Sequence, residues 1–220
     1  MVDVYKIQRR KSFFNKNATF LLLLVNVICF VVFSALIYFN SAFMDYIALK
    51  PANILSGMFL WTFLTSMFMH GGLFHLFANM LSLLFLGGFV EKILGKKRFI
   101  SLYLISGLFA GIFFVLSSLF FVSDFNTYAV GASGALFALT GLLMLLTPNL
   151  PVYIMFIPIP IKMKYAAPAM LIVLWVVSLL GDIPVGNMAH LGGFLVGIIY
   201  AVYLKSKYKN KTKYLSKYFS

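Results

Sequence analysis

Long apolar segments recur along this 220-residue chain and constrain its fold more than any other feature. Lipid offers no hydrogen-bond partner to an irregular backbone, so a segment of about 20 apolar residues crosses a bilayer as a helix. Hydrophobic residues make up 62% of the chain and charged residues only 10%, which is far from the composition of a soluble domain. The sequence therefore predicts an all-α, polytopic membrane protein. Its six transmembrane helices are expected near residues 19–39, 72–90, 99–122, 130–147, 167–181 and 188–205.

The two ends of the chain are basic and polar, whereas its middle is apolar. The first apolar segment, Thr19 to Phe39, is longer than the hydrophobic region of a signal peptide, so it is expected to remain as a helix. The predicted organisation is a basic tail over 1–18, a six-helix membrane domain over 19–205 and a second basic tail over 206–220.

The positions of the charged residues support an even number of spans. All but Lys50 of the 18 Lys and Arg residues lie in the two tails, at the end of the sixth span (Lys205) or in the connections 91–98 and 148–166, which six spans place on one face. Lys and Arg favour the cytoplasmic side, so both termini are predicted to be cytoplasmic in a cell membrane. The same clustering explains the net charge of +13 better than nucleic-acid binding does. The basic C-terminal tail could also contact anionic lipid head groups.

The connection over residues 40–71 is too long for a tight turn and too apolar for a disordered linker. A structured element that lies partly in the outer leaflet is expected there. The connection ends near His70, the first of only three histidines in the chain.

Polar residues inside apolar segments are costly in lipid, and they therefore favour a functional role. All three histidines, His70, His75 and His190, lie at or inside such segments. His75 and Asn79 are four residues apart, so a helix presents both on one face. They could direct hydrogen-bond donors into one cavity, or they could form an interhelical polar clamp.

A serine lies at the start of the fourth predicted span, within the run Gly131-Ala132-Ser133-Gly134. Small residues of this kind often serve close helix packing, which is the alternative explanation. The neighbouring glycines nevertheless leave Ser133 accessible. The start of the helix also directs free backbone N–H groups toward its surroundings.

The sixth predicted span carries His190, Gly193 and Gly197 on one face, and the two glycines form a GxxxG pair. If the small face of the fourth span packs there, the His190 imidazole meets the Ser133 hydroxyl as a base meets a nucleophile. Asp182 is poorly placed as a third member, so the prediction is a dyad. The polar pair of the second span would add donors for a developing oxyanion.

No cofactor and no metal site are expected. The chain has one cysteine, Cys29, which is interpreted as a small buried hydrophobe. His70 and His75 are five residues apart with no glutamate between them, which is not the pattern of a zinc protease helix.

Three motifs resemble those of the rhomboid family, in the same order and in the corresponding spans. The first is the run Trp61-Thr62-Phe63-Leu64-Thr65-Ser66-Met67-Phe68-Met69-His70-Gly71-Gly72-Leu73-Phe74-His75-Leu76-Phe77-Ala78-Asn79-Met80. Gly131-Ala132-Ser133-Gly134 is similar to the family's G-x-S-G motif, and Ala189-His190-Leu191-Gly192-Gly193 through Gly197 is similar to A-H-x-x-G-x-x-x-G. The resemblance covers roughly residues 15–205 and implies an intramembrane serine protease with a six-helix core.

The resemblance also implies roles for individual residues. By position, Ser133 is the nucleophile, His190 is the general base, and His75, Asn79 and the Ser133 N–H form the oxyanion hole. The supporting positions are His70, Glu91, Phe137, Gly131, Gly134, Gly193 and Gly197. Among them Glu91 resembles a structural acid of the family, although it could instead pair with Lys92 or bond a nearby backbone group.

Two residues depart from the family pattern. Thr62 follows Trp61 where the family often has an arginine, which affects the anchoring of the outer loop. Phe137 stands where some members carry a tyrosine that stacks on the histidine. Phe137 can stack but has no hydroxyl to donate.

The implied activity is hydrolysis of peptide bonds within or beside transmembrane segments of other membrane proteins, and the oligomeric state stays open. Substrate is expected to enter laterally near the fifth span, with Gly181 to Asn187 as a mobile cap. An inactive relative that binds transmembrane clients would be expected to lack the serine or the histidine, and both are present. A transporter or channel would show internal symmetry or paired broken helices, and neither is evident.

Overall fold

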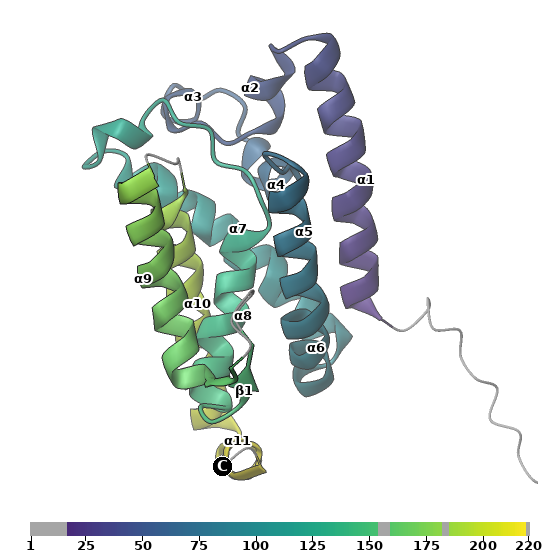
Figure 1. The fold of residues 1–220 in the computed structure, drawn as a ribbon, viewed down its shortest axis with the longest axis vertical. Coiled ribbons are helices and arrows are strands. Elements are labelled where there is room, and N and C mark those ends of the chain that lie inside the picture. The colour runs from purple at the N-terminus through teal and green to yellow at the C-terminus, as the bar shows by residue number, and fades with distance from the viewer. Residues whose placement is uncertain (1–16, 154–158, 182–184, 219–220) are drawn as a thin grey trace, which may run out of the picture.

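The structure is a computed structural model that describes residues 17–153, 159–181 and 185–218. Within these residues the long helices run side by side in one bundle (Figure 1). In chain order they are α1 (Ala18–Phe39), α5 (Leu73–Ser82), α6 (Gly88–Leu94), α7 (Lys96–Ser117), α8 (Ser133–Leu146), α9 (Met163–Gly181) and α10 (Asn187–Lys207). A π-helical segment, η3 (Leu83–Gly87), joins α5 to α6 as one span.

Five spans within the described residues are long and apolar enough to cross a membrane: α1, the combined α5–α6, α7, α9 and α10. The remaining apolar helix, α8, has 14 residues and is shorter. The prediction of an all-α polytopic membrane protein is confirmed. The fourth span, predicted over 130–147, is shorter because the backbone up to residue 132 is not helical.

The short helix α8 lies at the centre of the bundle, where α7, α9 and α10 pack around it. Every residue from 134 to 143 is buried. Because protein surrounds α8, this helix does not have to span the lipid by itself. For the same reason the irregular backbone that precedes it is tolerated at this depth.

Glycines let α8 and α10 approach each other closely. A Cβ atom placed on Gly193 would overlap the carbonyl oxygen of Gly134, and one on Gly197 would overlap the carbonyl oxygen of Ala138. From the other side, a Cβ on Gly141 would overlap a carbonyl oxygen of α10. The fourth span thus packs on the sixth through small residues, which is the condition under which the sequence places His190 beside Ser133. We call this contact the α8–α10 seam.

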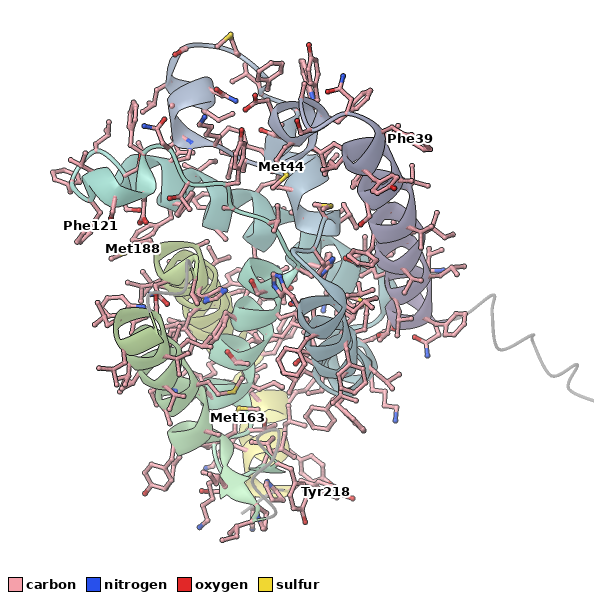
Figure 2. All side chains as sticks on the ribbon, turned by 45° about the horizontal axis from the view of Figure 1, so that its top comes forward. Phe39, Met44, Phe121, Met163, Met188 and Tyr218 are labelled. Carbon is pink, nitrogen blue, oxygen red and sulfur yellow. The ribbon has the colours of Figure 1, made fainter. Side chains whose placement is uncertain are left out.

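The turn between α6 and α7 and the end of α10 meet at one end of the bundle. Gly95 in this turn has a φ of +81°, and Arg98 Nη2 donates to the Tyr208 hydroxyl at 3.2 Å. The start of α1 and the C-terminal region lie at this end too (Figure 1). Figure 2 labels Met163 and Tyr218 near this end, and Met44 and Phe121 near the opposite one. The basic residues of the tail before residue 17 lie outside the described residues.

The connection between α1 and α5 is structured, as predicted. It contains α2 (Phe43–Ile47), α3 (Pro51–Leu55), α4 (Thr62–Thr65) and the 3₁₀ helix η2 (Ser66–Phe68). Its anchors are the Trp61 indole N–H, which donates to the Tyr46 carbonyl at 2.9 Å, and the Thr65 hydroxyl, which donates to the Ile47 carbonyl at 2.8 Å. The Thr62 hydroxyl bonds locally, to the Phe59 carbonyl at 2.7 Å.

Four features differ from the sequence prediction or were not part of it. The connection over 148–166 contains a short antiparallel pair, β1 (Pro151–Val152) and β2 (Ile161–Lys162). The fifth span, predicted over 167–181, begins at Met163 and has 19 residues. Within the second basic tail, α11 (Lys209–Tyr218) forms a helix that lies across the end of the bundle (Figure 1). Cys29 is half-buried on α1, not fully buried.

Candidate active site

Ser133 and His190 lie side by side in the bundle. The Ser133 Oγ and His190 Nε2 atoms are 2.7 Å apart, which is a short hydrogen bond. Ser133 is the first residue of α8, and His190 lies in the first turn of α10. The α8–α10 seam places them together. Gly193 follows His190 by three positions on α10, and it packs against Gly134, the residue directly after Ser133. The distance lies in the range of a nucleophile and its general base.

Gly131 shapes the space in front of the serine. Its φ of +117° belongs to the left-handed region that favours glycine. A Cβ atom at this position would lie 2.8 Å from His75 Nε2 and 3.7 Å from Ser133 Oγ, so both atoms border one small space. The Gly131 N–H donates to the Ser66 carbonyl at 2.9 Å. This bond ties the segment before α8 to the connection between α1 and α5.

His75 presents a donor to this space. Its Nδ1 atom accepts a long hydrogen bond of 3.4 Å from the Gly71 N–H. In a neutral imidazole the proton then sits on Nε2, the atom that faces Gly131 and the serine hydroxyl. Because Ser133 begins a helix, its backbone N–H has no intrahelical acceptor and forms a second donor at the same place.

Asn79 lies one helical turn after His75 and is buried. Its Nδ2 atom donates to the His75 carbonyl at 2.9 Å, which uses one of its two amide hydrogens. This bond runs along one helix, so among the described residues it is not the interhelical clamp that was the alternative interpretation. It holds the amide on the face of α5 that carries the histidine.

The His190 ring is packed on one side and lacks a partner on the other. Phe137 lies against it, with ring centroids 4.6 Å apart and an angle of 30° between the planes, so the predicted stacking contact is present. His190 Nδ1 is buried, and no atom of the described residues bonds it. The described part of the chain therefore contains a pair and no third member. Asp182 lies outside the described residues.

His70 packs against His75. It is buried and lies edge-on to His75, with ring centroids 5.2 Å apart. Burial, and to a smaller extent the neighbouring His75, lowers the pKa of His70 to about 4. His70 is therefore neutral at pH 7, which suits a packing role beside a hydrogen-bond donor.

Glu91 lies on α6, away from the serine, and joins two spans. Its carboxylate accepts the Ala18 N–H at 2.7 Å, the Thr19 N–H at 2.8 Å and the Thr19 hydroxyl at 2.7 Å. It thus satisfies free donors at the start of α1, where a negative charge is favourable. The local interpretation of Glu91 is wrong, because its partners precede it by more than 70 residues in the chain.

A polar cluster that the sequence did not predict holds the segment leading to the serine. Asp45 Oδ1 accepts the Tyr128 hydroxyl at 2.7 Å and the Asn53 amide at 2.9 Å. These two bonds lower the pKa of Asp45, while burial and the nearby carboxylate raise the pKa of Tyr128 to about 12. Next to them Ala129 exchanges two backbone hydrogen bonds with Leu49. Apart from one acid in the outer connection, the sequence carries no signal for this cluster.

The fold and the site define a class: a multi-pass helical membrane protein in which a serine and a histidine meet inside the bundle. Comparison with known proteins narrows that class. The Rhomboid domain model matches residues 58–207, so the chain belongs to the rhomboid family.

The names of the relatives differ in what they state about activity: one is called a protease, one is called inactive, and one name states no activity. RHOMBOID-like protein 1 of Arabidopsis thaliana is 42% identical over 63% of this chain and 33% of its own length. Inactive RHOMBOID-like protein 8 of the same plant is 35% identical over 62% of this chain and 36% of its own length. Rhomboid protease GlpG of Yersinia pseudotuberculosis is 29% identical over 82% of this chain and 61% of its own length. The chain thus spans less than two thirds of each of these relatives, and family membership alone does not decide activity.

Proposed function

We propose that this protein is an intramembrane serine endopeptidase that cleaves peptide bonds in or near transmembrane segments of other membrane proteins. The observation that carries the proposal is the 2.7 Å distance between Ser133 Oγ and His190 Nε2. A hydroxyl and an imidazole in this arrangement share one proton, which activates the oxygen as a nucleophile.

The reaction follows from the proton positions. Ser133 Oγ attacks the substrate carbonyl carbon while His190 Nε2 takes the hydroxyl proton, and a tetrahedral intermediate forms. The C–N bond then breaks as His190 returns that proton to the leaving amine, leaving an ester on Ser133. Water, deprotonated by the same nitrogen, attacks the ester and releases the carboxylic acid and the free serine.

Three donors are proposed to stabilise the oxyanion of the tetrahedral intermediate. These are the Nε2–H of His75, the second amide hydrogen of Asn79 and the backbone N–H of Ser133. Donors that are fixed before the reaction lose little free energy to reorganisation, and removing one typically costs about 3–4 kcal/mol of transition-state stabilisation. A side chain in place of Gly131 would intrude here, which supports the assignment.

The proposed substrates are helical membrane proteins, which would reach the serine sideways through the bundle. The end of α9 is highly exposed, with Leu179 and Leu180 80% and 84% accessible, so this helix is the proposed entry. The cap proposed over 181–187 lies partly outside the described residues. Both ends of the chain are proposed to be cytoplasmic, because Lys and Arg favour that side.

A serine-directed fluorophosphonate probe tests the proposal. The wild-type protein in detergent should be labelled at Ser133, and Ser133→Ala and His190→Ala should abolish the labelling. Ser101→Ala, at an exposed position on α7, is the matched control and should be labelled like the wild type. A folded wild type that takes up no probe would instead support an inactive, client-binding relative.

A further inference from the structure

Two buried polar atoms near the start of α10, one a potential donor and the other an acceptor, have unsatisfied hydrogen-bonding capacity. Neither His190 Nδ1 nor Asn187 Oδ1 has a hydrogen-bond partner among the residues that the structure describes. When Ser133 donates its hydroxyl proton to His190 Nε2, the neutral imidazole carries its own proton on Nδ1. His190 Nδ1 is then a donor without an acceptor, and Asn187 Oδ1 is an acceptor without a donor.

The two residues are also close in the helix. Asn187 is the first residue of α10 and His190 the fourth, so they are one turn apart on the same face. The Asn187 backbone N–H bonds the Val185 carbonyl at 2.7 Å, which holds the residue at the helix start. Side chains three residues apart on a helix are neighbours, so the step to be tested is a rotation of the Asn187 side chain toward the imidazole.

We infer that Asn187 positions His190: on rotation of the Asn187 side chain, its Oδ1 atom accepts the Nδ1 proton of the imidazole. The inference rests on the proposed protease function. It adds Asn187 as a neutral third member to a site for which the sequence predicts a dyad.

The bond matters most at the transition state. When His190 takes the serine proton, both ring nitrogens carry hydrogens and the ring becomes positive. The Nδ1 atom is buried, so its N–H depends on a protein acceptor or a bound water, and an unsatisfied buried cationic donor is costly. An acceptor at Nδ1 therefore lowers the barrier more than it strengthens substrate binding, and its loss should reduce kcat with little change in KM.

Two substitutions separate this role from a structural role at the start of the helix. Asn187→Leu keeps the approximate volume but removes the acceptor, and Asn187→Asp keeps an acceptor and adds a negative charge. With wild-type protein in proteoliposomes as reference, Asn187→Leu should lower kcat about tenfold to a hundredfold at unchanged KM, the order expected for an unsatisfied buried donor.

Asn187→Asp gives the sharper readout, because it moves the pH profile. A carboxylate beside the ring favours the imidazolium, and the base must be neutral to act. The acidic limb of kcat/KM should therefore shift to higher pH. Met188→Leu, in the same turn and packed against a separate apolar cluster, is the control and should keep the wild-type profile.

Wild-type kcat in Asn187→Leu would overturn the inference, as would equal losses in both variants with an unmoved pH profile. If Asn187→Leu does not fold, the pH profile of Asn187→Asp decides alone: a shifted acidic limb supports the inference, and an unmoved one overturns it. Either result leaves the proposed function standing, since that function is tested separately, by the activity of the wild type and by its loss in Ser133→Ala and His190→Ala.

Discussion

Ser133 lies in the α8–α10 seam, and the connection between α1 and α5, here called the outer connection, bonds the segment that leads into the serine, but different forces hold the two regions. In the seam, glycines bring backbone against backbone, and no space remains for a single added methyl group. In the outer connection, side-chain hydrogen bonds such as those of Asp45 to Tyr128 and Asn53 hold short helices and turns. The seam sets the distance between nucleophile and base, whereas the connection sets the path of the chain into the nucleophile. Changes in the seam should therefore act on activity far more strongly.

The largest effect is expected at Gly193. Gly193→Val would force atoms into the Gly134 carbonyl, so α8 and α10 must separate and the serine and histidine with them. A displacement of about 1 Å can cost a hundredfold in rate, and overpacking costs about 1–3 kcal/mol of stability. Cleavage of a membrane substrate and thermal unfolding would measure the two effects. Gly88→Ala is the control, because nothing lies within 4 Å of its added Cβ and activity should be retained. Full activity in Gly193→Val would mean that the seam does not set the distance.

Gly131, in the segment between α7 and α8 that leads into Ser133, should give the next largest effect. In Gly131→Ala the new Cβ would displace His75 Nε2, which lies 2.8 Å away, and thereby a proposed oxyanion donor. We expect kcat to fall about tenfold to a hundredfold. Gly57→Ala is the matched control: its φ of +77° strains an alanine in a similar way, but its surroundings are open. Equal losses of activity in both variants would assign the effect to backbone strain, not to His75.

A smaller effect is expected at Tyr128. Tyr128→Phe removes the hydroxyl that donates to Asp45 at 2.7 Å and loosens the segment before the serine. A lost hydrogen bond of this kind costs about 1 kcal/mol, so activity should fall by about fivefold at most. Tyr153→Phe, at an exposed position directly after β1, is the control for the loss of a tyrosine hydroxyl. A loss as large as that in the seam would show that the connection shares in setting the catalytic distance.

Asp45 should make the same connection sensitive to acid. Its hydrogen bonds, first from Tyr128 and then from Asn53, hold its pKa below the value of about 3.9 in an unfolded chain. Its contribution to stability is therefore complete above that value and is lost as the pH falls through the lower pKa of the folded state. Thermal unfolding in detergent between about pH 5 and 3 should show this loss in the wild type and not in Asp45→Asn. Parallel curves for the two proteins would remove Asp45 from the acid response.

The small-residue face of the seam could be predicted from the sequence, whereas the hydrogen bonds of the outer connection could not. Gly193, Gly197 and the small residues around Ser133 form a local pattern that lipid-embedded helices use for close packing, so the partner helix was recognisable. The contacts of Asp45 with Tyr128 and of Glu91 with Ala18 join residues more than 70 positions apart, and nothing in the local sequence marks such partners.

The start of the fifth span and the whole helix α11 were not predicted from the sequence, in both cases because lysines hide the helical pattern. The fifth span begins at Met163, inside a segment whose lysines resemble a loop, because these lysines lie at the end of the bundle where charge is tolerated. The helix α11 was missed because a lysine-rich tail shows no apolar periodicity over a full span, although Leu215 packs against the core.

The most direct test of the proposed activity is cleavage of a single-span substrate in proteoliposomes, with the products mapped by mass spectrometry. We predict one cut in or beside the transmembrane segment, lost in Ser133→Ala and in His190→Ala and unchanged in Ser101→Ala. Cleavage that persists in Ser133→Ala, or folded wild-type protein that never cuts, would contradict the assignment of Ser133 and His190 as nucleophile and base.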